Sequence, residues 1–386
     1  MATLAREMHF PDADTLLDRY PLPDDLRSGA RVGLVELLAA LEDEIGLNAN
    51  GRARALYGIN EDLRRLKAIA DDRARFPAIA EVEILSPMFI LGLPRCGTSL
   101  LHALIDGDPQ VRTPLMWEVA DPSPPPEAAT FDTDPRIARF EGYIERELGG
   151  KIDEIAKAHP FGAKIPQECG SFMTTSFRSS NPVMMNRIPG FYRWFLGADV
   201  TFRYQVHKMW LQQLSWRNPR PHWALKIQEH MYSLPELRSV YPDAIFVQPH
   251  RDPTTVIASI SQLIRVIRTP AFDKQDPIAL GQEMLHLWHD GQVRMMAYRS
   301  AHPEMPIHDM RYRDLATDPV AAVRGIYDRF GWEFTLQSEA GILDWLAENP
   351  ANQHGKHSYA LEDFGLTEDE VREVYQDYIE TYREYI

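Results

Sequence analysis

Residues 86–101 read SPMFILGLPRCGTSLL, and this stretch decides the fold. The apolar run 88–91 predicts a short buried strand, which is followed by a turn and by a helix that begins at 100–105. Gly92 and Gly97 remove side-chain bulk from the turn, so successive backbone N–H groups can converge on an anion. The N-terminus of the helix adds roughly half a positive charge. The stretch therefore predicts a phosphate-binding loop.

The loop lacks the lysine that a nucleotide triphosphatase needs. The spacing of Gly92 and Gly97 matches the pattern G-x-x-x-x-G-K-[ST], but Thr98 occupies the lysine position. The clamp on the β- and γ-phosphates is therefore missing, and a different cation, Arg95, stands inside the loop. A kinase or hydrolase would also need a magnesium-binding acid at the end of a second strand, where HRDP at 250–253 offers a cation instead. We expect a different nucleotide at this loop.

A second stretch, residues 244–263, reads AIFVQPHRDPTTVIASISQL and predicts a strand, a loop and a helix. Pro253 suits the first turn of the helix. Arg251 at the end of the strand can hold a phosphate through a planar, bidentate contact. Ser259 points toward the same place from two turns along the helix.

Together the two stretches resemble the sulfotransferase family, which takes a sulfuryl group from 3′-phosphoadenosine 5′-phosphosulfate (PAPS) and releases adenosine 3′,5′-bisphosphate. In that family a loop P-[RK]-x-G-T-[ST] follows the first strand and holds the 5′-phosphosulfate, and residues 94–99 here read PRCGTS. The family's second motif is an Arg at a strand end and a Ser eight residues later, both binding the 3′-phosphate, and Arg251 and Ser259 match it. The resemblance is good over 86–118 and 223–263.

The resemblance implies roles for the residues of the loop. Arg95 would bind the bridging and phosphosulfate oxygens, and the backbone N–H groups of Gly97 and Thr98 would support it. The hydroxyls of Thr98 and Ser99 would donate to the 5′-phosphate, and Cys96, where the family commonly has Ser, would be a small neutral filler against the cofactor. Arg95 replaces the Lys of the cytosolic animal enzymes, as in the tyrosylprotein and many bacterial members. Because Arg keeps its proton, it would act as an electrostatic clamp.

Three residues are candidates for the base that takes the acceptor proton. Glu118 follows the loop helix, as the base often does in the Arg-type members, and its apolar neighbours would desolvate it. His230 lies two residues beyond the base position of the K-T-H motif of the animal enzymes, and Glu168 lies in KIPQECG. Lys226, in WALKIQEH, matches the family Lys and would stabilise the transferring group.

The C-terminal part resembles the family more loosely. Tyr312 in MRYRDL fits the Tyr of the family's Y-E-D-L stretch, which lies near the adenine, although Arg313 replaces the acid. His354 and Lys356, in NQHGKHSY at 352–359, stand where the family's C-terminal loop closes over the 3′-phosphate with basic residues.

Composition excludes some functions. The net charge of −15 and the pI near 5.3 argue against nucleic-acid binding, because no basic stripe exists to meet a phosphate backbone. Two cysteines make no disulfide framework. The first twenty residues show neither a signal peptide nor a long apolar span, so we expect a cytoplasmic protein of bacterial type with no membrane span. No metal-ligand spacing is apparent, and sulfuryl transfer in this family needs no metal.

The order of elements predicts the domain organisation. Residues 1–80 would form a helical N-terminal arm, and 81–386 a sulfotransferase domain with a Pro-rich, mostly helical insertion at 121–220. Further strands are expected at 223–227, 244–249 and 306–312, with a helix at 235–241. Strands that alternate with helices predict an α/β fold, a central parallel sheet with helices on both faces. The resemblance makes this a P-loop NTPase-like sulfotransferase fold.

The acceptor is the least defined partner. Residues 161–220 are rich in Phe, Trp and Met and fall between the two cofactor motifs, which suits a lid over a lipophilic or aromatic small molecule that carries a hydroxyl or an amine. An alternative function is a catalytically silent sensor of PAPS or of the bisphosphate. A second copy of the chain, in a homo-oligomer, is a further candidate partner.

Overall fold

The computed structural model describes residues 9–43, 46–148, 161–350 and 360–386. A five-stranded sheet lies at its centre, in the order β2-β3-β1-β4-β5, and every neighbouring pair is parallel. The strands are β1 (Met88–Ile90), β2 (Val111–Arg112), β3 (His222–Lys226), β4 (Ile245–His250) and β5 (Ile307–Arg311). The expected parallel α/β sheet is therefore confirmed, with one short strand, β2, that the sequence did not predict.

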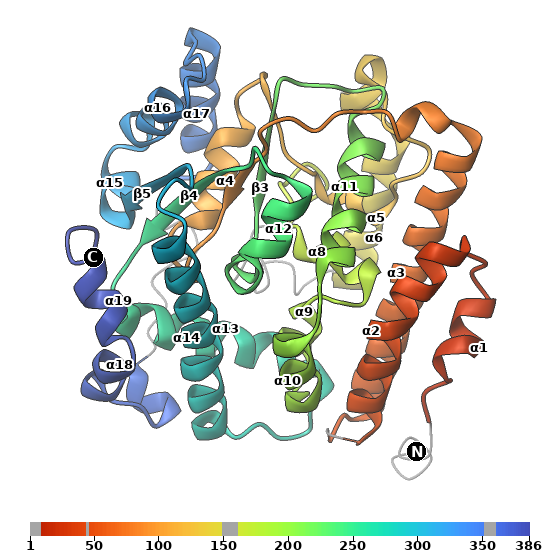
Figure 1. Ribbon diagram of the computed structural model, residues 1–386, viewed down its shortest axis with the longest axis horizontal. Helices are drawn as coiled ribbons and strands as arrows, with labels where there is room; N and C mark the ends of the chain where they lie inside the picture. The colour runs from red at the N-terminus through yellow and green to blue at the C-terminus, as the bar shows by residue number, and fades with distance from the viewer. Residues whose placement is uncertain (1–8, 44–45, 149–160, 351–359) are drawn as a thin grey trace.

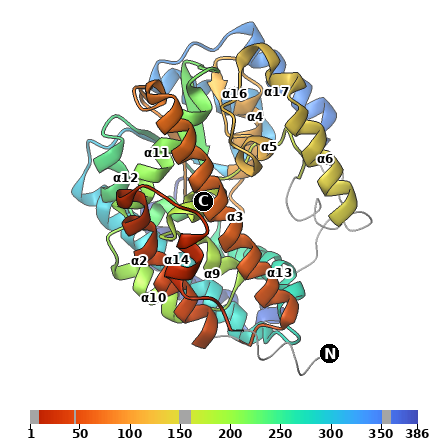
Figure 2. The same ribbon diagram turned by 90° about the vertical axis from the view of Figure 1, so that its right-hand side faces the viewer.

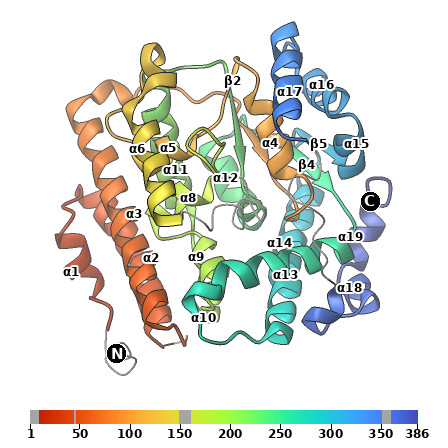
Figure 3. The same ribbon diagram turned by 180° about the vertical axis from the view of Figure 1, so that it is seen from behind.

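β1 is buried on both sides, because helices cover both faces of the sheet. Met88 and Ile90 point into one core, which is shared with α4 (Thr98–Asp106), α16 (Pro319–Phe330) and α17 (Leu336–Glu348). These helices are grouped beside β4 and β5 in Figure 3. Phe89 points the opposite way into the larger core. That core holds side chains of α11 (Thr201–Ser215), α12 (Leu234–Val240), α13 (Pro253–Arg268) and α14 (Pro277–Ala301).

The N-terminal arm, residues 1–80, is mostly helical over the residues that the structure describes. It consists of α1 (Ala13–Asp18), α2 (Asp24–Asp43) and α3 (Ala49–Arg75), which lie along one side of the molecule (Figure 1 and Figure 2). Leu56 of α3 is partly buried against the larger core, and these leucines of α2 and α3 are buried in it: Leu34, Leu37, Leu38, Leu41, Leu63 and Leu66. The arm therefore packs on the same core as the sheet.

The segment between the two motifs is mostly helical. It contains α5 (Met116–Ala120), α6 (Pro135–Leu148), α8 (Gly170–Met173), α9 (Asn181–Met185) and α10 (Pro189–Gly197), with 3-10 turns η3 (Ala128–Thr133) and η5 (Thr174–Ser176). The prolines keep residues 121–127 out of any helix, and η3 follows directly after them.

The remaining elements close the structure around the sheet. They are η2 (Pro77–Ile79), η6 (Gln228–Tyr232), η7 (Thr269–Ala271), α15 (Tyr312–Thr317), η8 (Leu361–Phe364), α18 (Glu368–Val374) and α19 (Gln376–Thr381). The acidic C-terminal segment forms the short helices α18 and α19, and the hydroxyl of the buried Tyr378 contacts Nδ1 of His250 at 3.0 Å. In the described part of the chain, no helix has the combination of length and apolarity that crossing a bilayer requires.

Candidate active site

The predicted phosphate loop joins β1 to α4 and has the backbone of an anion-binding turn. Gly92 and Gly97 have φ values of 111° and 82°, and Arg95 is also left-handed at 62°, which is uncommon for a residue with a side chain. Gly97 caps α4, and no side chain in the described residues accepts a hydrogen bond at this cap. A Cβ on Gly97 would lie 2.7 Å from the Tyr312 ring, so this position needs glycine. The N–H groups that open α4 are available to an anion.

The two sequence motifs meet in space. Nε of Arg95 donates a hydrogen bond to Oγ of Ser259 at 3.1 Å. Nη1 of Arg251, which follows β4, donates to the carbonyl oxygen of Arg95 at 3.0 Å. The Arg251 guanidinium also lies 4.4 Å from the centre of the Tyr312 ring. The structure therefore brings together Arg95, Arg251, Ser259 and Tyr312, from residues that lie up to 217 apart in the chain (312 − 95 = 217).

A third cation reaches the loop from the end of β3. Lys226 pairs in register with Ile90 of β1, which places it at the carboxyl edge of the sheet beside the loop. Its ammonium donates to Oγ of Ser99 at 2.9 Å and forms an ion pair with the Glu168 carboxylate. The Lys226 side chain is 2% exposed, whereas that of Glu168 is 25% exposed. Two of the sequence candidates, Lys226 and Glu168, therefore form one contact group at the loop.

Sequence reasoning missed Gln228. Its side-chain amide donates to Oγ1 of Thr98 at 2.9 Å, so it holds the first residue of α4. The available signal was its position two residues after Lys226, since alternate residues of an extended chain point to the same side.

Glu118 has a different environment. It is fully buried in α5, and both carboxylate oxygens accept from Arg112, Nη1 to Oε2 at 2.9 Å and Nη2 to Oε1 at 2.5 Å. The backbone N–H of Leu115 donates to Oε2 at 3.0 Å. The apolar enclosure that the sequence predicted is present, but these hydrogen bonds tie the carboxylate to β2 and not to the phosphate loop.

His230 is also enclosed. Its side chain is fully buried, and Nδ1 lies 3.0 Å from the hydroxyl of Tyr204. Burial, together with the nearby His207 and Arg203, lowers the pKa of His230 well below its ordinary value, so the ring is neutral near pH 7. A neutral imidazole has the correct form for a base, but this one is sealed from the surface on which Glu168 lies.

The other predicted contacts are placed as follows. Burial raises the pKa of the Cys96 thiol to about 12, which suits a neutral filler and excludes a thiolate nucleophile. Tyr312 lies directly against Gly97 and Arg251. His354 and Lys356 lie outside the described residues.

Comparisons with known proteins agree with this geometry. A model of the sulfotransferase family matches residues 87–336. A sulfotransferase of Mycobacterium avium has the same fold, with a TM-score of 0.88, 24% identity and 97% of each chain covered. A sulfotransferase of Mycobacterium tuberculosis has a TM-score of 0.82 at 26% identity, covering 95% of this chain and 97% of its own. No curated protein matches the sequence. The family match spans well over half of the chain and contains both phosphate motifs, so the protein belongs to the sulfotransferase family.

Proposed function

We propose that this sulfotransferase uses PAPS as its donor and transfers the sulfuryl group to a hydroxyl or amine of a lipophilic or aromatic small molecule. The observation that carries the proposal is the convergence of three cations on one loop in a chain of net charge −15. Arg95, Lys226 and Arg251 gather where the N-terminus of α4 already favours an anion. Such a cluster would be electrostatically costly without a multiply charged ligand.

Two groups of contacts divide the donor between them. The backbone of residues 95–98, with Ser99 and Lys226, would hold the 5′-phosphosulfate. Arg251 and Ser259 would hold the 3′-phosphate, and the contact between Arg95 and Ser259 joins the two sites. ATP has no 3′-phosphate to occupy the second site, which favours PAPS.

Glu168 is the base that this geometry favours. Its carboxylate pairs with Lys226 and is partly exposed, so an acceptor can approach it. Glu118 has both oxygens bonded to Arg112, and His230 is sealed in the core. In the proposed step the acceptor oxygen attacks sulfur as its proton passes to Glu168, and the bond from sulfur to the 5′-phosphate oxygen breaks. Lys226 and Arg95 balance the charge that develops on the departing phosphate.

A cavity supports the choice of a lipophilic acceptor. It has a volume of about 190 Å³ and lies between the N-terminal arm and α9 and α13. Its walls are mostly apolar and include Leu37 and Ile59 of the arm and Pro182 and Met185 of the insertion. Asn181, which lines the cavity, lies near Gly170, two residues after Glu168. The arm of residues 1–80 and the insertion of 121–220 would then together form the acceptor pocket.

The proposal is tested by incubating the protein with radiolabelled PAPS and a panel of aliphatic, sterol-like and phenolic alcohols and amines. We expect transfer to at least one apolar acceptor. Glu168→Gln should lower kcat by roughly 10²–10⁴-fold, since this is the usual contribution of a general base. The matched control is Glu236→Gln on α12, which contacts no candidate site residue in the described part of the chain and should leave kcat unchanged. Normal donor binding without transfer to any acceptor would favour the sensor alternative, and an undiminished kcat in Glu168→Gln would exclude Glu168 as the base.

A further inference from the structure

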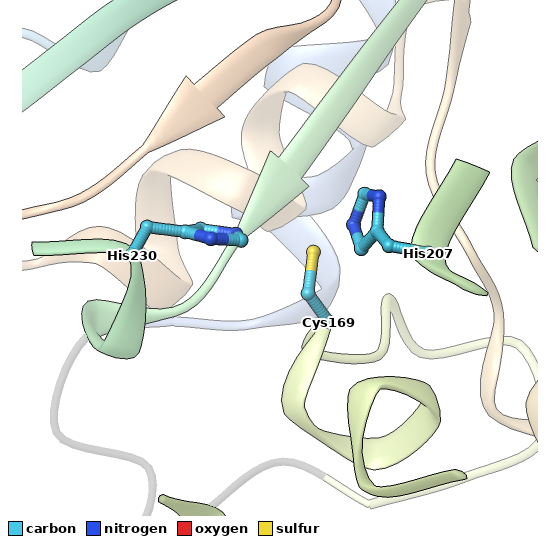
Figure 4. Close-up of side chains that lie close together, drawn as sticks. All are labelled: Cys169, His207 and His230. Atoms are coloured by element: carbon cyan, nitrogen blue, oxygen red, sulfur yellow. The ribbon is translucent and has the colours of Figure 1, made fainter. Parts of the chain in front are cut away.

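Three side chains that can bind metals meet in the core behind the end of β3. Cys169 lies at the N-terminus of α8, His207 on α11 and His230 on η6. Each offers one ligand atom, and these atoms all lie within 4.8 Å of one another. All three residues are fully buried. Figure 4 shows the Cys169 sulfur between the two imidazole rings.

The two imidazoles are oriented from behind by tyrosines. Nδ1 of His207 lies 2.8 Å from the hydroxyl of Tyr241, and Nδ1 of His230 lies 3.0 Å from that of Tyr204. Where each Nδ1–H donates to its tyrosine oxygen, Nε2 carries the free lone pair. Metal-binding histidines are commonly held in this way, with the second nitrogen bonded to an outer partner.

Both Nε2 atoms are buried and lack a hydrogen-bond partner among the described residues. One unsatisfied buried polar atom costs roughly 1–3 kcal/mol, and this cluster holds two of them. Buried polar atoms without partners in an apolar core point to a ligand-binding site.

We propose that Cys169, His207 and His230 bind one thiophilic d10 metal ion, Zn²⁺ or Cu⁺, through Sγ and the two Nε2 atoms. One sulfur and two imidazole nitrogens form a donor set that both ions accept. Binding releases the thiol proton to solvent, because a coordinating thiol is deprotonated. Bound ligand atoms lie roughly 3.5 Å apart, since metal–nitrogen and metal–sulfur bonds are about 2.0–2.3 Å long, so the side chains close slightly around the ion.

The two candidate ions differ in the net charge that they leave in the core. A thiolate with Cu⁺ is neutral, whereas a thiolate with Zn²⁺ keeps one positive charge. The metal content of protein expressed with zinc or with copper distinguishes the two ions.

The ion would connect α8, α11 and η6 directly behind the candidate active site. The backbone N–H of Cys169 donates to the carbonyl oxygen of Lys226 at 3.0 Å, and Cys169 is the neighbour of Glu168. Its role is therefore structural: it fixes the segment that carries the Lys226–Glu168 pair. Sequence spacing gave no sign of it, because the ligands come from three elements separated by 23 to 38 residues (230 − 207 = 23; 207 − 169 = 38).

The experiment measures metal in the full chain, expressed with zinc or with copper under reducing conditions and purified without an affinity tag that binds metals. We expect a stoichiometric amount of one ion in the wild type. Cys169→Ser should contain less than about one tenth of that amount of metal. Tyr241→Phe should weaken metal binding by about 10–100-fold, because His207 loses its outer hydrogen-bond partner. The control is Cys96→Ser, which removes the other buried thiol and should keep the metal.

A second readout is spectroscopic and does not depend on activity. Protein loaded with Co²⁺ should show a thiolate charge-transfer band in the wild type and in Cys96→Ser, and none in Cys169→Ser. A chelator should lower the Tm of the wild type. Folded wild-type protein that contains only traces of metal from either culture, and whose Tm neither chelator nor added metal changes, would overturn the proposal and leave a thiol packed against two imidazoles.

Discussion

Alanine at position 97 should damage donor binding for two separate reasons. The left-handed φ of 82° costs an alanine about 1–2 kcal/mol. The new Cβ would also lie 2.7 Å from one carbon of the Tyr312 ring and 3.1 Å from the next, so the ring must move. Because that ring packs on the Arg251 guanidinium, its movement also disturbs the second phosphate contact. We expect the Kd for adenosine 3′,5′-bisphosphate to rise about 10–100-fold, which is about 1.4–2.8 kcal/mol.

The assay is calorimetric titration at fixed ionic strength, combined with thermal unfolding. Gly331→Ala is the matched control: Gly331 has a similar φ of 71°, but a Cβ there meets no atom within 4 Å. It should lower the Tm through backbone strain and leave the Kd unchanged. Adding Tyr312→Ala to Gly97→Ala should weaken binding by less than the sum of the two single effects, because both act on one contact. Wild-type affinity in Gly97→Ala would refute this reasoning about the loop.

Three further predictions concern buried charges. Glu118→Gln should lower the free energy of unfolding in urea by roughly 3–5 kcal/mol, because it leaves the buried Arg112 guanidinium unpaired. A variant as stable as the wild type but with a selectively lower kcat would instead identify Glu118 as the base. Burial alone would raise the pKa of Asp309, but hydrogen bonds from His250 and Arg299 bring it down to about 2 from 3.8. This depressed pKa stabilises the fold above 3.8 by roughly 2 kcal/mol, so the stability advantage of the wild type over Asp309→Asn should shrink in urea titrations as the pH falls from about 5 to about 2. Lys226→Met should lower kcat by roughly 10²-fold or more with a smaller effect on bisphosphate affinity, and equal losses in both would show that it only binds the donor.

The two phosphate motifs could be predicted because their chemistry is local. A strand, a glycine turn and a helix N-terminus follow one another in residues 86–101, and Arg251 and Ser259 are fixed by one strand end and one helix. That these motifs meet follows from parallel strands, whose carboxyl ends share one edge of the sheet. Both the sheet and its helical layers could therefore be predicted from the sequence.

The sequence could not predict which side chains pair with one another, and a side chain's partner decides what it can do. Glu118 has the apolar neighbours expected of an activated base, but the guanidinium of Arg112 lies on a strand of two residues, too short for any periodicity to predict. Glu168 is held beside the phosphate loop by its ion pair with Lys226, 58 residues later in the chain. Such contacts depend on tertiary packing, which composition and spacing do not encode.

The donor is the central claim, and calorimetric titration with adenosine 3′,5′-bisphosphate tests it most directly. The bisphosphate should bind the wild type, and Arg251→Ala should lose about 1.5–3 kcal/mol, the usual value of a charge-assisted hydrogen bond. Arg313→Ala, which removes an exposed arginine beside the site, should bind like the wild type. ATP with Mg²⁺ should give no heat. Binding of ATP together with indifference to the bisphosphate would contradict the assignment of PAPS as the donor.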